Sequence, residues 1–168
     1  MTIEQKAIFI RVIIGAFLTI IVLILPFICP VFLPLSSVQL FFLSLLIPTF
    51  MYCLGIIRVA NLRFFDEKVT NPILQHNTEK LIIYRQYLQN TLEQLVLALI
   101  TYATLCFVLP LGSLYLILLL SLLFGIGRIL FMLGYAKGGS GRAFGFALTF
   151  YPNILGFLLG VIILLFTL

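Results

Sequence analysis

Five long apolar stretches constrain the fold of this chain more than any other feature of its sequence. Four of them reach the roughly 20 residues that an α-helix needs to cross a hydrocarbon layer of about 30 Å. The third is strictly apolar only between residues 95 and 109, but a helical pattern extends it back to Lys80, which gives a helix of about 45 Å. We therefore predict five transmembrane helices, at approximately residues 8–27, 38–57, 80–109, 114–133 and 143–168.

The composition excludes a soluble protein. Of the 168 residues, 63% are hydrophobic and only 9% are charged, too few charges to give a water-soluble domain of this length its polar surface. The lipid bilayer must surround most of the chain. We therefore expect an all-α membrane protein that forms one compact membrane domain, with no room for a separate soluble enzyme.

The charge distribution supports five spans rather than four. With five spans, every lysine and arginine faces one side of the membrane, whereas a four-span arrangement scatters them over both sides. The positive-inside rule then places the N-terminus and both charged connections in the cytoplasm and the C-terminus outside. The basic residues are Lys6, Arg11, Arg58, Arg63, Lys68, Lys80, Arg85, Arg128, Lys137 and Arg142.

The connections carry residues that end helices. Pro26, Pro30 and Pro34 separate the first two stretches, and Pro110 begins a tight turn before the fourth. Residues 66–79 form the longest polar loop, and the Lys-Gly-Gly-Ser-Gly-Arg sequence of residues 137–142 predicts a flexible basic turn. The first stretch is not followed by a small-residue cleavage site, so we expect it to remain as a helix rather than act as a signal peptide.

No metal site is expected. The single histidine, His76, lies in the polar loop without a cysteine or a second histidine near it. The three cysteines, Cys29, Cys53 and Cys106, fall in or beside apolar stretches without CxxC spacing, which favours buried free thiols.

Two helical faces carry candidate functional residues. In the third stretch, Gln86, Asn90 and Glu93 have the i, i+4 and i+7 spacing of one helix face. Glu93 directly precedes the apolar run, where a carboxylate is costly unless a cation or ligand pairs with it; the alternative is a solvated residue at the membrane interface. In the fourth stretch, Arg128 and Tyr135 share a face, which is also typical of ordinary interface anchoring.

The order of these motifs resembles the MAPEG family, the membrane-associated proteins in eicosanoid and glutathione metabolism. The motifs are Asn-x-x-Glu at Asn90 and Glu93, followed on the next helices by Arg-x6-Tyr-x6-Arg at Arg128, Tyr135 and Arg142. The resemblance extends over residues 54–168 and is greatest to bacterial members. It implies a four-helix transmembrane domain at residues 38–168, preceded by an extra N-terminal helix and connection at residues 1–37, in the inner membrane of a bacterium.

The resemblance also implies a ligand and its binding residues. Members of the family form homotrimers that bind glutathione between subunits near the cytoplasmic face. Arginine suits the carboxylates of glutathione because its guanidinium makes paired hydrogen bonds. By position, the glutathione site comprises Arg85, Gln86, Asn90, Glu93, Arg128, Tyr135 and Arg142, with Arg58 or Arg63 as the catalytic cation beside the sulfur. The family usually has arginine at the position of Gln86, and tyrosine or histidine at the position of Phe131.

Two functions follow. The first is a glutathione-dependent transferase or peroxidase, with glutathione as co-substrate and hydrophobic electrophiles or lipid hydroperoxides as substrates that arrive from the membrane lipids. The alternative is a non-catalytic lipid-binding or scaffold protein on the same fold, which the substitutions at Gln86 and Phe131 favour. A channel or transporter is disfavoured because no stretch carries charges at its centre, and no nucleic-acid partner is expected.

Overall fold

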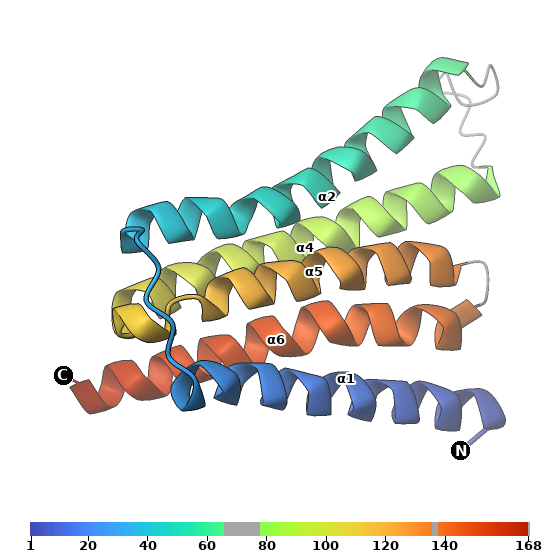
Figure 1. Ribbon diagram of the computed structural model, residues 1–168. Coiled ribbons are helices and arrows are strands. Elements are labelled where there is room, and N and C mark those ends of the chain that lie inside the picture. Colours follow the sequence, from blue (N-terminus) through green and yellow to red (C-terminus); the bar gives the residue numbers. More distant parts are fainter. Residues whose placement is uncertain (66–77, 136–137, 168) are drawn as a thin grey trace.

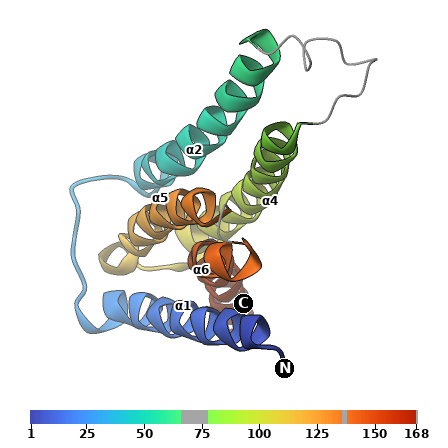
Figure 2. The ribbon, with the colours of Figure 1, turned by 90° about the vertical axis from the view of Figure 1, so that its right-hand side faces the viewer.

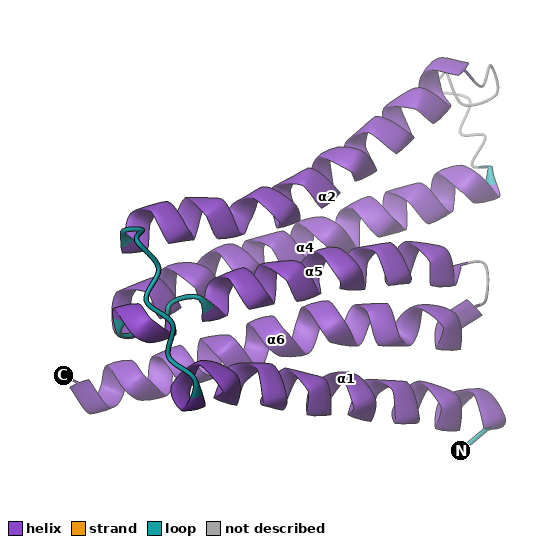
Figure 3. Cartoon of the chain, viewed as in Figure 1, coloured by secondary structure: helices purple, strands orange, loops and turns teal. Residues whose placement is uncertain are grey.

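The computed structural model describes residues 1–65, 78–135 and 138–167, which form five long helices (Figures 1 and 3). The helices are α1 (Ile3–Ile28), α2 (Ser37–Phe65), α4 (Glu79–Val108), α5 (Leu116–Gly134) and α6 (Gly138–Thr167), with a short 3-10 helix, η2 (Leu111–Ser113), before α5. All five are long and apolar enough to cross a membrane. The predicted all-α membrane fold is confirmed; His76, Lys68, Lys137 and most of the predicted polar loop lie outside the described residues.

The first two helices are longer than their apolar stretches. α1 begins at Ile3, where Thr2 forms a capping box with Gln5: the Thr2 hydroxyl accepts from the Gln5 N–H at 3.2 Å, and the Gln5 side chain accepts from the Thr2 N–H at 2.8 Å. Pro26, which we predicted to interrupt the chain, lies inside α1. α2 continues to Phe65. The polar end turns extend each helix beyond its apolar run.

The predicted flexible turn at residues 137–142 is wrong for its described part, because Gly138 begins α6. The glycines there and nearby bring α5 and α6 into close contact. A Cβ atom on Gly145 would lie 2.6 Å from the carbonyl oxygen of Gly127, and one on Gly134 would collide with the backbone of Gly141. Small residues allow such backbone contacts between transmembrane helices. The glycine-rich segment therefore serves helix packing.

Four of the helices form a bundle, and the fifth lies outside it. α2 packs against α4 and α5, and α6 packs against the same two helices, so the four alternate around the bundle. α1 lies along α6 on the outside (Figure 2). The contact is close, because a Cβ atom on Gly15 would lie 2.6 Å from the Cβ atom of Ala147.

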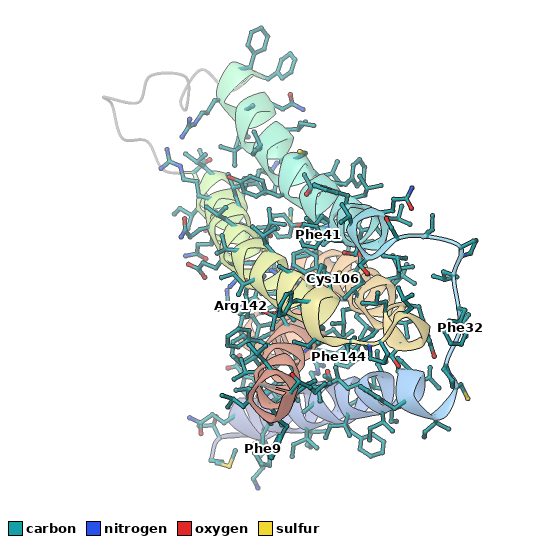
Figure 4. The ribbon with its side chains drawn as sticks, turned by 90° about the vertical axis from the view of Figure 1, so that its left-hand side faces the viewer. Phe9, Phe32, Phe41, Cys106, Arg142 and Phe144 are labelled. Atoms are coloured by element: carbon teal, nitrogen blue, oxygen red, sulfur yellow. The ribbon has the colours of Figure 1, made fainter. Side chains whose placement is uncertain are left out.

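The outer faces of the helices are apolar, as a lipid environment requires. Phe9 of α1, for example, projects away from the bundle (Figure 4) and is 55% exposed. The two termini lie at opposite ends of the bundle (Figure 1). The basic residues that the structure describes all lie toward the end of the bundle where the N-terminus of the chain is found. We call this the basic end; it is marked by Lys6, Arg63, Lys80 and Arg142.

We predict that Gly145→Ala destabilises the protein by about 1–3 kcal/mol, the usual cost of overpacking a close contact. Thermal unfolding of the detergent-purified protein measures the change. Gly139→Ala is the matched control in the same helix, since its Cβ atom would meet only the flexible ends of Glu4 and Ile8, at 3.3 and 3.6 Å. Equal unfolding temperatures for the two variants would contradict the close contact between α5 and α6.

Candidate functional site

A cavity of ≈ 580 Å³ opens at the basic end between α1, α4, α5 and α6, and we call it the basic-end pocket. It brings together four of the residues predicted for the glutathione site: Gln86, Asn90, Tyr135 and Arg142. Among the described residues, the remainder of its lining is apolar or glycine: Ile8, Val12, Phe131, Gly139, Ala143 and Phe146. The lining therefore combines hydrogen-bonding groups and a cation with a hydrocarbon surface.

Tyr135 connects α4 and α6 at the mouth of this pocket. Its hydroxyl donates a hydrogen bond of 2.7 Å to Oε1 of Gln86. The guanidinium of Arg142 lies over its ring, 4.9 Å from the centroid, which is a cation–π contact. An arginine at position 86 could not accept the hydrogen bond from Tyr135, because a guanidinium has no acceptor. Gln86 therefore acts as the acceptor in a side-chain contact between α4 and the end of α5.

Arg128 lies deeper in the bundle and is 0% exposed. Its Nη1 donates to Oδ1 of Asn90 at 2.7 Å, and its Nη2 donates to the hydroxyl of Thr149. The guanidinium also lies 4.6 Å from the centroid of the Phe131 ring. Among the described residues no carboxylate pairs with Arg128. Neutral oxygens and an aromatic ring thus stabilise a cation within the helix bundle.

The contact with Arg128 decides what Asn90 presents to the pocket. Because Arg128 occupies the amide oxygen of Asn90, the group available to a ligand is the amide NH2, a donor suited to carbonyl or carboxylate oxygens. Arg128 does not line the pocket itself. Within one chain it orients Asn90.

The other predicted site residues lie outside the basic-end pocket. Glu93 is exposed on the outer face of α4, where it accepts a hydrogen bond of 3.0 Å from the side chain of Gln89. Arg58 is exposed on α2. Arg63 and Arg85 line a separate cavity between α2 and α4. The predicted roles of these four residues toward glutathione remain predictions. Because they lie outside the basic-end pocket, they could contact a ligand bound there only if a neighbouring subunit supplied them.

Several residues of the site were not predicted from the sequence. Thr149, the second partner of Arg128, is a single buried hydroxyl in an otherwise apolar part of α6. Ile8 and Val12 of α1 line the pocket, but nothing distinguishes them from the many other apolar residues of that helix. The one sequence signal for Thr149 is its position four residues after Gly145, which puts a polar residue on the same face of the helix as that glycine.

The chain is similar to known proteins over part of its length. The family model described as "MAPEG family" matches residues 37–162, from the start of α2 into α6 and without α1, which confirms the predicted resemblance. Transmembrane protein 79 from Mus musculus and from Bos taurus is in each case 40% identical over 70 residues. This segment covers 42% of the chain and 18% of each relative, so the chain spans less than a fifth of the length of these relatives.

No solved structure matches the chain. The predicted bacterial origin is not borne out, since both of these relatives are mammalian.

We predict that Asn90→Ala destabilises the protein by about 1–2 kcal/mol, because it leaves one buried donor of Arg128 without its acceptor. Arg128→Met removes the charge and puts an unbranched apolar side chain in place of the guanidinium. Thermal unfolding of both variants and of the double variant forms a double-mutant cycle. The double variant should lose less stability than the sum of the single variants, and Gln89→Ala, an exposed neighbour on α4, should change little. Additive losses would contradict the contact.

Proposed function

Because the chain belongs to the MAPEG family, we propose that it is an integral membrane protein that binds glutathione in the basic-end pocket and uses it as a co-substrate. The observation that supports this most is the convergence of Gln86, Asn90, Tyr135 and Arg142, from three helices, on one cavity. Glutathione is a net anion, and its carboxylates suit the fork of hydrogen-bond donors on Arg142. The amide NH2 of Asn90 suits a second oxygen of the peptide.

The apolar side of the pocket suits the second substrate. Ile8, Val12 and Phe146 form a hydrocarbon surface beside the polar groups. A hydrophobic electrophile or a lipid hydroperoxide would reach this surface from the bilayer. The two substrates would then meet where the polar and apolar sides of the pocket join.

The chemistry we propose begins with the thiolate of glutathione, which is the nucleophile. A positively charged site favours the thiolate over the thiol, and the candidates for the cation beside the sulfur are Arg58 and Arg63 of a neighbouring subunit. In a transferase reaction the sulfur forms a bond to the electrophilic carbon, the leaving group departs with the bonding electrons, and the thiol proton passes to solvent. In a peroxidase reaction two glutathione molecules reduce the hydroperoxide to an alcohol and water and are oxidised to the disulfide.

We expect millimolar glutathione to raise the unfolding temperature of the detergent-purified protein, because a ligand that binds the folded state stabilises it by mass action. A concentration of 100 times the Kd contributes about 2.7 kcal/mol. Arg142→Ala should abolish this stabilisation, whereas Lys80→Ala, an exposed basic residue at the same end, should retain it. Absence of stabilisation at saturating glutathione would overturn the proposal.

The same measurement on Glu93→Ala addresses assembly. The family resemblance implies a homotrimer with glutathione between subunits, and an exposed carboxylate near the membrane interface is costly unless it is paired, which supports a contact between subunits at Glu93. Loss of the glutathione effect in Glu93→Ala would indicate a site shared between subunits. Retention would indicate that the basic-end pocket of one chain is sufficient.

A non-catalytic lipid-binding protein is the second candidate. It is favoured by the apolar surface around Phe131 and by the position of Arg58, Arg63 and Glu93 outside the pocket. This candidate predicts stabilisation by a long-chain fatty acid without stabilisation by glutathione. It also predicts no glutathione-dependent turnover of an aryl halide or of cumene hydroperoxide.

We also propose that the basic end faces the cytoplasm, following the positive-inside rule. Cys29, which is exposed just beyond the far end of α1, then faces the opposite side. A membrane-impermeant maleimide should label the protein in spheroplasts of a bacterial expression host, and Cys29→Ser should lose this labelling. Labelling that requires permeabilised membranes would reverse the orientation.

A further inference from the structure

The separate cavity between α2 and α4 has a volume of ≈ 460 Å³ and lies at the basic end. We call it the α2–α4 groove. Arg63, Arg85 and Gln89 are its polar lining residues, and Ile56, Val59 and Leu88 are among its apolar ones. None of its described lining residues belongs to the basic-end pocket.

Helical spacing gives the groove a gradient of polarity. On α2, Ile56, Val59 and Arg63 lie three or four residues apart and share one face. Arg85 and Leu88 have the same relation on α4, which runs in the opposite direction. Ile56 therefore lies about 10 Å farther from the basic end than Arg63. The arginines therefore lie nearer the end of the bundle than the apolar side chains, as expected if they reach the lipid headgroups and the apolar side chains face the hydrocarbon.

The groove faces outward and is not part of the bundle interior. Arg63, Arg85, Gln89 and Ile56 are all exposed, while Val59 is buried at its base. Toward the basic end α2 diverges from α5 (Figures 1 and 2). There, the small apolar cluster of Val59 and Leu81, with Leu62, Tyr84 and Leu88 packed against it, joins α2 to α4.

A phospholipid with an anionic headgroup matches this groove in charge, polarity and depth. Basic pockets between transmembrane helices bind anionic headgroups, and the planar guanidinium fits phosphate oxygens in pairs. A guanidinium has five N–H donors, so one that already makes a protein contact retains donors for a phosphate. We propose that Arg63 and Arg85 bind the phosphate of an anionic membrane phospholipid, with an acyl chain along Ile56 and Leu88.

This lipid has a structural consequence that does not depend on glutathione. Its phosphate contacts one arginine from each helix and so adds a polar link between α2 and α4 to the apolar cluster of Val59 and Leu81. The bound lipid therefore stabilises the α2–α4 pair against separation.

The test uses the full chain in nanodiscs of phosphatidylcholine, with phosphatidylglycerol added in increasing amounts. We expect phosphatidylglycerol to raise the unfolding temperature, and the double variant Arg63→Gln, Arg85→Gln to weaken this effect by roughly 30-fold in lipid concentration, since each basic residue contributes to anionic-lipid binding. The matched control is Lys6→Gln, Lys80→Gln, which removes the same charge at the same end outside the groove and should leave the effect intact.

Each remaining outcome is decisive. Equal losses in the two double variants would show general surface attraction and overturn the site. Equal stabilisation by inorganic phosphate in pure phosphatidylcholine would indicate a site for a free anion and overturn the lipid assignment. The variant Arg63→Lys, Arg85→Lys, which keeps the charge without the planar fork, should show an intermediate loss and controls for misfolding. All of these measurements are made without glutathione, whose binding is tested separately with Arg142→Ala in the basic-end pocket, so the two proposals fail separately.

Discussion

The backbone contact between α5 and α6 determines the geometry of the whole site. Glycines on both helices remove the side chains that would hold them apart, and a single methyl group on Gly145 would overlap the backbone of α5. At this separation Arg128 of α5 reaches Thr149 of α6, and Tyr135 lies beneath Arg142. The polar groups of the pocket are therefore arranged by residues that carry no chemistry themselves.

Arg128 shows how the bundle accommodates a charge away from water. Its guanidinium is held by an amide oxygen, a hydroxyl and an aromatic ring, and none of the described carboxylates pairs with it. Such an environment conserves the positive charge of the region, whereas an ion pair would cancel it. This charge, unpaired among the described residues, supports the proposed binding of an anion in the neighbouring pocket, which Arg142 lines.

Much of this arrangement follows from the sequence, and the failures have physical causes. Apolar length alone predicts five spans, because a bilayer demands a minimum helix length. Helical spacing correctly groups Gln86 with Asn90, but Glu93 lies two turns, about 10 Å, along α4 from Gln86 and is exposed outside the pocket. A shared helix face does not show how far along the helix a pocket extends. The Gly-Gly-Ser-Gly segment suggested a turn because glycine is flexible in isolation, while here it permits contact between helices. The packing of α1 on α6 was not predicted, because the small residue Gly15 that allows the close contact with Ala147 carries no sign of its partner in the sequence.

α1 adds two apolar residues to a pocket whose other described lining residues all lie in the segment shared with the family. The hydrogen-bonding groups belong to α4, α5 and α6, which lie in the segment shared with the family, whereas Ile8 and Val12 belong to a helix outside that segment. Substitutions in α1 can therefore reshape the hydrocarbon side while the polar side stays constant. Under the proposed function, changes at Ile8 and Val12 would alter which apolar molecules fit beside the polar ligand without changing the hydrogen-bonding side chains of the pocket.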